Sequence, residues 1–299
     1  IYKTFNFKIN INKMLDLYQI ADEIRILLDE RRKELNLYFI EDNHKYFMNN
    51  KEGQSKSNWP SVSKVLKSFY PPFPTQEASL KKAKGDVILQ KKLIKEWSQM
   101  ADYANNTGSR VHFFLEKSII ERFKLIKEVR EPEFDCDFEQ TITSDHMISY
   151  GIQFYEKMIK NGAVLIDTEV VMGDPELGYT GQADKIWLVS NKEKTQLGIV
   201  ITDWKSNKPK NFIETKWTTR MYSPYEDLPN TALGHYYVQL SLYGKLFQKM
   251  LDFTKYKSLP IVRASLILLK DNCYEEFRVP ISIVNKTIDL NILDYMKIH

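Results

Sequence analysis

Three consecutive β-rich runs constrain the fold of this chain more than any other feature. They occupy residues 163–172, 179–189 and 197–206 and are rich in β-branched and aromatic side chains. The segments between them, residues 173–178 and 190–196, are short and polar, and such connections join neighbouring antiparallel strands. We therefore predict an antiparallel meander in this part of the chain.

Helical patterns precede and follow the predicted meander. They cover residues 13–36, 76–104, 107–127, 143–160 and 230–250, with a break at the sequence NNTG (105–108) and an acidic loop at 131–141. Two further strands are expected at residues 260–270 and 273–280. This order predicts an α/β (α+β) fold, with a central mixed β-sheet flanked by helices and a helical N-terminal extension.

The charge balance permits a nucleic-acid partner without requiring one. The 299 residues include 43 Lys and Arg against 39 Asp and Glu, for a net charge of +4. Local clustering is more informative, because residues 81–95 contain a single acid, Asp86, among six lysines: Lys81, Lys82, Lys84, Lys91, Lys92 and Lys95. This run is either a solvated helix face or a surface that binds phosphates.

Cysteine usage and hydropathy indicate the compartment. The two cysteines, Cys136 and Cys273, cannot form a disulfide framework or a four-cysteine cluster, which favours a reducing environment. No apolar run approaches the roughly 18–20 residues of a membrane span. The first ten residues alternate apolar and polar side chains and lack the apolar block of a signal peptide. We therefore expect a cytoplasmic protein with no membrane partner.

Two acids in the predicted meander indicate a metal site. Asp184 lies in the second run and Asp203 near the end of the third, and paired strands lie about 4.8 Å apart. Carboxylates held so close repel each other unless a cation lies between them, and oxygen ligands favour Mg²⁺ or Mn²⁺. Lys205 shares a face with Asp203 and could orient a water or stabilise charge on a phosphate. The alternative is a simple ion pair on an edge strand.

The pattern Asp184…Asp203-x-Lys205 resembles the signature of the PD-(D/E)XK nuclease superfamily. The segment TGSRVHFFLEKS (107–118) resembles the opening helix of RecB-like members of that superfamily. This resemblance implies that His112 is a metal ligand, with Glu116 one helical turn away on the same face.

Two further segments extend the resemblance. GYTGQADKIW (178–187) resembles the glycine-then-acid strand of RecB-like nucleases, where Gly181 would leave room beside Asp184. HYYVQLSLYG (235–244) resembles their Gln-x-x-x-Tyr helix, which implies a DNA-binding role for Gln239 and Tyr243. Glu169 matches a strand glutamate of these families.

Over about residues 40–245 the chain looks similar to phage-encoded RecB-like exonucleases, which are themselves similar to the mitochondrial genome maintenance exonuclease. The resemblance implies a PD-(D/E)XK core at residues 105–299, and residues 1–104 forming part of a DNA cleft within one compact unit. Two cysteines cannot hold the iron–sulfur cluster that some members carry, so the chain resembles the cluster-free branch.

The resemblance implies a Mg²⁺- or Mn²⁺-dependent DNA nuclease. An exonuclease that acts on single-stranded or free DNA ends in replication, recombination or repair is favoured. The alternatives are a structure-specific or restriction-type endonuclease and a catalytically inactive DNA-binding protein. The implied catalytic residues are Glu116, Glu169, Asp184, Asp203 and Lys205, the metal ligands are His112, Asp184 and Asp203, and the DNA-binding residues are Lys81, Lys82, Lys84, Gln239 and Tyr243.

Overall fold

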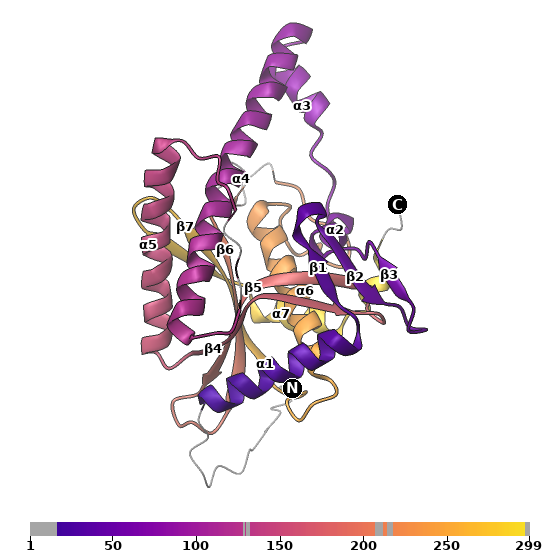
Figure 1. Ribbon diagram of the computed structural model, residues 1–299. Helices are drawn as coiled ribbons and strands as arrows, with labels where there is room; N and C mark the ends of the chain where they lie inside the picture. The colour runs from indigo at the N-terminus through magenta and orange to yellow at the C-terminus, as the bar shows by residue number, and fades with distance from the viewer. Residues whose placement is uncertain (1–16, 128, 130–131, 207–211, 214–217, 297–299) are drawn as a thin grey trace.

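A five-stranded sheet forms the centre of the molecule (Figure 1). The computed structural model describes residues 17–127, 129, 132–206, 212–213 and 218–296. The strands of the sheet, in spatial order, are β4 (Val164–Asp174), β5 (Tyr179–Ser190), β6 (Leu197–Lys205), β7 (Ile261–Leu269) and β8 (Tyr274–Arg278).

The pairing of these strands confirms the predicted meander and the mixed sheet. β4, β5 and β6 pair antiparallel in chain order, as their short polar connections require. β7 then pairs parallel to β6, and β8 pairs antiparallel to β7. The parallel pair is possible because the long segment between β6 and β7 contains a crossover helix, α6 (Ala232–Leu251).

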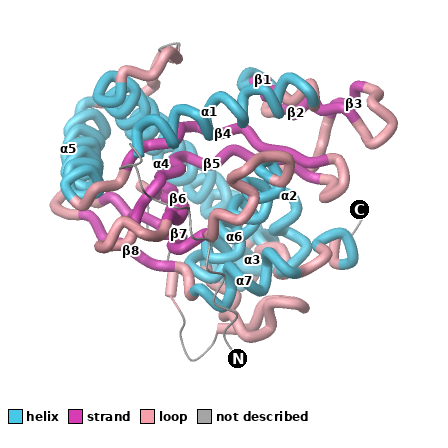
Figure 2. Tube along the Cα trace, turned by 90° about the horizontal axis from the view of Figure 1, so that it is seen from below, coloured by secondary structure: helices cyan, strands magenta, loops and turns pink. Residues whose placement is uncertain are grey.

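Helices cover both faces of the sheet (Figures 1 and 2). The other helices are α1 (Leu17–Glu34), α2 (Val62–Leu66), α3 (Thr75–Lys82), α4 (Val87–Phe123), α5 (Phe138–Lys160) and α7 (Ile281–Asp289). A small antiparallel sheet, outside the main one, consists of β1 (Tyr38–Ile40), β2 (Lys45–Asn49) and β3 (Ser55–Ser57). Among the described residues, no helix has the length and apolar character needed to cross a lipid bilayer.

The alternation of side chains along the strands separates two buried apolar clusters. In β6, Ile199 and Ile201 belong to the cluster shared with α1, α6 and α7. Val200, between them, belongs to the cluster shared with α4 and α5. Because successive side chains point to opposite faces, a strand covered on both sides must be apolar at nearly every position. This explains the continuous apolar runs in the sequence.

The N-terminal region shares its core with the main sheet. Ile24 and Leu28 of α1 and Met48 of β2 lie in the same buried cluster as Ile186 of β5. α1 confirms the amphipathic helix expected at residues 13–36, although residues 1–16 lie outside the described part of the chain. The N-terminal region and the sheet are therefore packed as one unit, with no separate core at the expected boundary near residue 104.

The predicted helix break at residues 105–108 is wrong, because α4 runs through it without interruption. The hydroxyl of Thr107 donates a hydrogen bond to the Tyr103 carbonyl oxygen at 2.9 Å and accepts one from Gln140 of α5 at 3.2 Å. The Asn106 amide donates to the Asp135 carbonyl oxygen at 3.0 Å. These tertiary bonds use the polar side chains that made the segment look like a loop.

The start of α5 also differs from the prediction. The helix begins at Phe138 rather than near residue 143, so part of the expected acidic loop is helical. Asp137 and Gln140 form a capping box, in which each side chain bonds the backbone N–H of the other residue. One acid of the expected loop, Asp137, therefore caps the N-terminus of α5.

Gly151 of α5 allows close contact with α4, the helix that carries His112 and Glu116. A Cβ atom at Gly151 would lie 2.6 Å from both Cδ atoms of Leu115, which is fully buried. The contact lies between the helices and the sheet, where there is little room for Leu115 to move. Gly151 therefore helps to set how closely α5 approaches α4.

We expect Gly151→Ala to destabilise the protein by about 1–3 kcal/mol, as overpacking of a core does. The matched control is Gly244→Ala in α6, where the nearest atom to an added Cβ is 3.5 Å away. That substitution should be neutral or stabilising by up to about 1 kcal/mol, since alanine favours helix. Urea unfolding of both variants measures the difference. Equal free energies of unfolding for the two variants would show that the α4–α5 contact has room for a methyl group at residue 151.

Candidate metal centre

Glu169 of β4 and Asp184 of β5 face each other across the strand pair. Val170 pairs with Ala183, so the preceding Glu169 lies opposite Asp184 in the antiparallel register. The backbone of Glu169 is left-handed, with φ of 46°, which is uncommon for a residue other than glycine. Glu169 thus combines an uncommon backbone conformation with a side chain that lies beside the carboxylate of Asp184.

Asp203 of β6 lies on the other side of Asp184. Thr202 pairs with Lys185, so continuing the register by one residue places Asp203 opposite Asp184. There the Asp184 Oδ2 accepts a hydrogen bond of 2.7 Å from the backbone N–H of Trp204. Three neighbouring strands thus each contribute one carboxylate to a row across the sheet.

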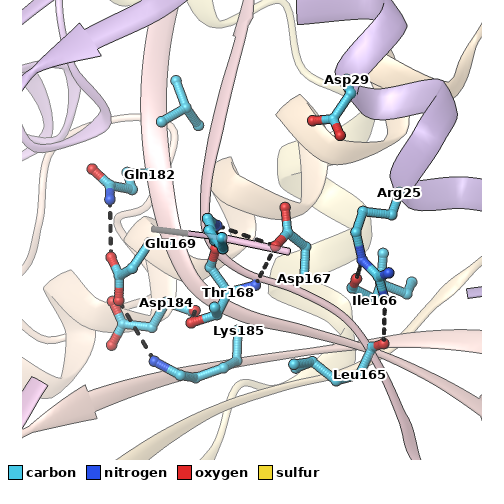
Figure 3. Close-up of polar contacts among 12 residues, drawn as sticks. Arg25, Asp29, Leu165, Ile166, Asp167, Thr168, Glu169, Gln182, Asp184 and Lys185 are labelled. Carbon is cyan, nitrogen blue, oxygen red and sulfur yellow. Dashed lines mark hydrogen bonds and ion pairs between the residues drawn. The ribbon is translucent and has the colours of Figure 1, made fainter. Parts of the chain in front are cut away.

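The Glu169 carboxylate is held from two sides by residues of β5 (Figure 3). The Gln182 amide donates to Glu169 Oε2 at 3.0 Å, and the Lys185 ammonium lies 3.5 Å from Oε1. Lys185 is fully buried, and burial of an ammonium is costly unless charges of opposite sign lie near it. Burial lowers the pKa of Lys185, but Tyr155, Glu169 and Asp184 outweigh it and raise the pKa, so the ammonium stays charged.

α4 brings two more titratable side chains to the row. His112 Nδ1 lies 3.5 Å from Asp184 Oδ2. Glu116 is half-buried one turn along the helix, and burial raises the pKa of its carboxyl group, opposed by the charge of Lys185. The helix therefore supplies an imidazole and a fourth acid to this part of the sheet.

The structure groups His112, Glu169 and Asp184 as possible ligands of one ion. One ligand atom from each of these side chains lies within 4.8 Å of the other two. Glu169 Oε1 is buried and makes no hydrogen bond within the described chain. Two carboxylates and an imidazole suit a divalent ion such as Mg²⁺ or Mn²⁺. The residues present therefore fit the expected metal.

Asp203, the third ligand expected from the sequence, has another partner in this structure. Its carboxylate contacts the Lys205 ammonium, which also lies 5.1 Å from the ring centroid of Tyr236. The resemblance implies a catalytic role for Glu169, whereas the structure also makes it a possible ligand. Antiparallel pairing of β4 with β5 places it beside Asp184. The ligand role of Asp203 stays a prediction.

Burial and mutual repulsion separate the pKa values of the three acids. Burial, with the charge of Asp184, raises the pKa of Glu169 to about 8 and that of Asp203 to about 6. Burial also opposes ionisation of Asp184, but His112, Lys185 and Lys205 outweigh it and lower its pKa. Asp184 is therefore the carboxylate that ionises first.

The two basic groups of the centre differ in charge. Burial lowers the pKa of His112, which favours the neutral imidazole that binds metals. Burial also opposes the charge of Lys205, but Asp203 and Asp184 raise its pKa. A neutral imidazole thus lies beside Asp184, in the middle of the acidic row, and a charged ammonium lies at its Asp203 end.

The predicted pair on α6 is present, but only one member is accessible. Gln239 donates a hydrogen bond of 2.9 Å to the Tyr243 hydroxyl, and Tyr243 is buried. A Cβ atom at Gly181 would lie 2.9 Å from Tyr243 Cε1 and 2.8 Å from Val62 Cγ2. Gly181 thus makes room for these two side chains. The DNA-binding roles of Gln239 and Tyr243 stay predictions.

The remaining expected DNA-binding residues lie away from the metal centre. Lys81 and Lys82 end α3, and Lys84 follows in the turn before α4; all three are exposed. α4 continues for 25 residues from Val87 to His112, which is about 37 Å at 1.5 Å per residue. The lysines and the acidic row are thus separate features of one molecule.

Comparison of the chain with models of known protein families and with curated proteins gave no match.

We expect the metal-free protein to lose stability as pH rises from about 5 to 8. The folded-state pKa of Glu169, about 8, lies above its ordinary value near 4.5, so the folded state keeps a proton that the unfolded state has lost. Asp203 acts in the same direction up to about pH 6. Thermal unfolding of Glu169→Gln should show a weaker pH dependence. Glu193→Gln, at an exposed position, is the control. If stability falls equally with pH in the parent protein, Glu169→Gln and Glu193→Gln, the pKa of Glu169 is not the cause of the fall.

We expect Mn²⁺ to raise the unfolding temperature more at pH 8 than at pH 6, because binding requires ionised carboxyl groups. A site with [Mn²⁺] at 100 times Kd would stabilise the protein by about 2.7 kcal/mol. Asp184→Asn and His112→Ala should remove most of this effect in calorimetry. If Asp203 is a ligand, Asp203→Asn should also reduce the rise in unfolding temperature that Mn²⁺ causes. Unchanged Mn²⁺ binding in Asp184→Asn would exclude this site.

Proposed function

We propose that this chain is a divalent-metal-dependent nuclease that hydrolyses phosphodiester bonds in DNA. The observation that carries the proposal is the row of Glu169, Asp184 and Asp203 across three strands, with His112 beside Asp184 and Lys205 beside Asp203. Acids so close together cost free energy unless a cation neutralises them. A chain that only binds DNA would gain nothing from keeping them.

The side chains of the row have distinct roles in this proposal. His112, Glu169 and Asp184 hold the metal ion, which would supply Lewis-acid stabilisation of the phosphate and lower the pKa of a bound water. Lys205 keeps its positive charge and donates hydrogen bonds to a phosphate oxygen or to the attacking water. Asp203 orients the Lys205 ammonium through their direct contact.

The choice of DNA and of an exonuclease rests on the resemblance to RecB-like nucleases. Its motifs fall on suitable elements: His112 on a helix that faces the sheet, Asp184 and Asp203 on paired strands, and Gln239 on the crossover helix. A RecB-like exonuclease would need a free DNA end. An endonuclease with the same centre would not, and this difference separates the two alternatives.

We expect the purified chain with Mg²⁺ to degrade end-labelled linear DNA, and to leave covalently closed circular DNA intact. Lys205→Ala should lower the cleavage rate by about 10²–10⁴, the range for losing a positioned charge-stabilising group. DNA affinity should change much less, because one phosphate contact among several is lost. Gel assays and fluorescence anisotropy measure the two effects.

The matched control is Lys192→Ala in the exposed turn between β5 and β6, which should cleave at the normal rate. Rapid linearisation of closed circles would support the endonuclease. Full activity in EDTA or in Asp184→Asn would exclude the metal mechanism. DNA binding without any cleavage would support the inactive DNA-binding protein.

A further inference from the structure

α3 and the first part of α4 form a helical arm, residues 75–97, that extends beyond the sheet (Figure 1). The Gln90 amide donates hydrogen bonds to the Gln76 carbonyl oxygen at 3.0 Å and to the Ser79 hydroxyl at 3.2 Å. At the base of the arm, the Phe73 ring lies 6.1 Å from that of Trp97. The two helices are thus bonded to each other.

The arm carries most of the net positive charge of the chain. It contains six lysines and three acids, a net charge of +3, whereas the whole chain has +4. One of the acids, Asp86, accepts hydrogen bonds from the N–H groups of Ile88 and Leu89 as the cap of α4. Within the described part of the chain, five of the lysines have no carboxylate at ion-pair distance: Lys81, Lys82, Lys84, Lys91 and Lys95. The Lys82 ammonium lies 5.6 Å from the ring centroid of Trp97. The charge of these lysines is available to an external anion.

The tip of the arm combines these lysines with exposed apolar side chains. Val87, Ile88 and Leu89 are 57%, 83% and 41% exposed, in the first turn of α4. Nucleic acids offer both matching surfaces, because lysines contact phosphates while apolar side chains stack on or insert between bases. Charge complementarity thus favours a nucleic-acid strand as the occupant of the tip.

The arm is aligned with the metal centre along one helix. Residues spaced three or four apart share a helix face, and the face of His112 continues toward the arm through Gly108, Ala101 and Ser98 to Lys91. The first three of these side chains are small, and at Gly108 an added Cβ atom would lie 2.9 Å from the Ser206 hydroxyl oxygen. Lys91 lies 21 residues from His112, which is about 32 Å along the axis. For a strand that keeps the stacked rise of about 3.4 Å per nucleotide, this distance corresponds to about nine nucleotides.

We propose that the arm is a second nucleic-acid-binding surface, which holds the substrate strand about nine nucleotides from the phosphate at the metal centre. This inference rests on the proposed nuclease function and adds to it a dependence on substrate length. Strands shorter than this distance reach only the metal centre. Longer strands also contact the lysines and the apolar tip.

The test measures binding of single-stranded oligonucleotides of 4 to 20 nucleotides by fluorescence anisotropy, with Ca²⁺ and the Asp184→Asn background to prevent cleavage. We expect affinity to rise with length up to about ten nucleotides. A variant with Lys81, Lys84, Lys91 and Lys95 replaced by Gln should lose this rise. Its salt slope should fall by up to about 3, at about 0.7 per phosphate contact.

Ile88→Ser separates the apolar contact from the charge. It should weaken binding of long strands by about 10- to 100-fold, the range for losing the burial of one isoleucine side chain, with little change in the salt slope. The control replaces Lys192 and Lys194 by Gln in the exposed turn between β5 and β6, and its length dependence should match that of the parent protein.

Three results distinguish this inference from the proposed function. Equal length dependence in the parent and the four-lysine variant would overturn the role of the arm, whatever the nuclease activity. Arm-dependent binding to vesicles containing phosphatidylserine, without arm-dependent DNA binding, would assign the arm to a membrane surface and also overturn it. In the third result, the affinity of the wild-type protein rises with oligonucleotide length, yet the protein cleaves neither DNA nor bis(p-nitrophenyl) phosphate. That result would overturn the proposed nuclease function and leave the arm as a DNA-binding surface.

Discussion

The repulsion among three carboxylates in adjacent strands is the constraint on which the rest of this structure depends. Glu169, Asp184 and Asp203 occupy one row because β4, β5 and β6 pair in a fixed register. A shift of one residue in either pair would turn one acid to the opposite face. The apolar clusters on both faces of the sheet prevent such a shift, so core packing and site geometry have the same origin.

The surroundings of the row offset its negative charge unevenly. Lys185 lies buried beside Glu169, and Lys205 contacts Asp203. Asp184 lies between them. Its carboxylate contacts the His112 imidazole and accepts a hydrogen bond from the backbone N–H of Trp204. Despite burial, His112, Lys185 and Lys205 lower the pKa of Asp184, so the middle acid of the row keeps its charge, and a cation would be stabilised there.

Much of the fold and part of the centre could be predicted from the sequence. The meander followed from short polar connections between apolar runs, and the pairing of Asp184 with Asp203 followed from the meander. The NNTG segment was misjudged because its polar side chains are typical of loops, yet they bond to α5 and to the segment before it. Such contacts join residues about 30 positions apart and leave no local pattern.

The sequence by itself determined which residues lie on which strand and face, because alternation and connection length act over a few residues. It also determined the charge of the arm and the identity of the acids. Only the tertiary structure decided that Glu169 joins His112 and Asp184 while Asp203 contacts Lys205. Those groupings depend on the left-handed backbone at Glu169 and on the approach of α4 to the sheet. Both are set by packing between distant segments, which no spacing along the chain encodes.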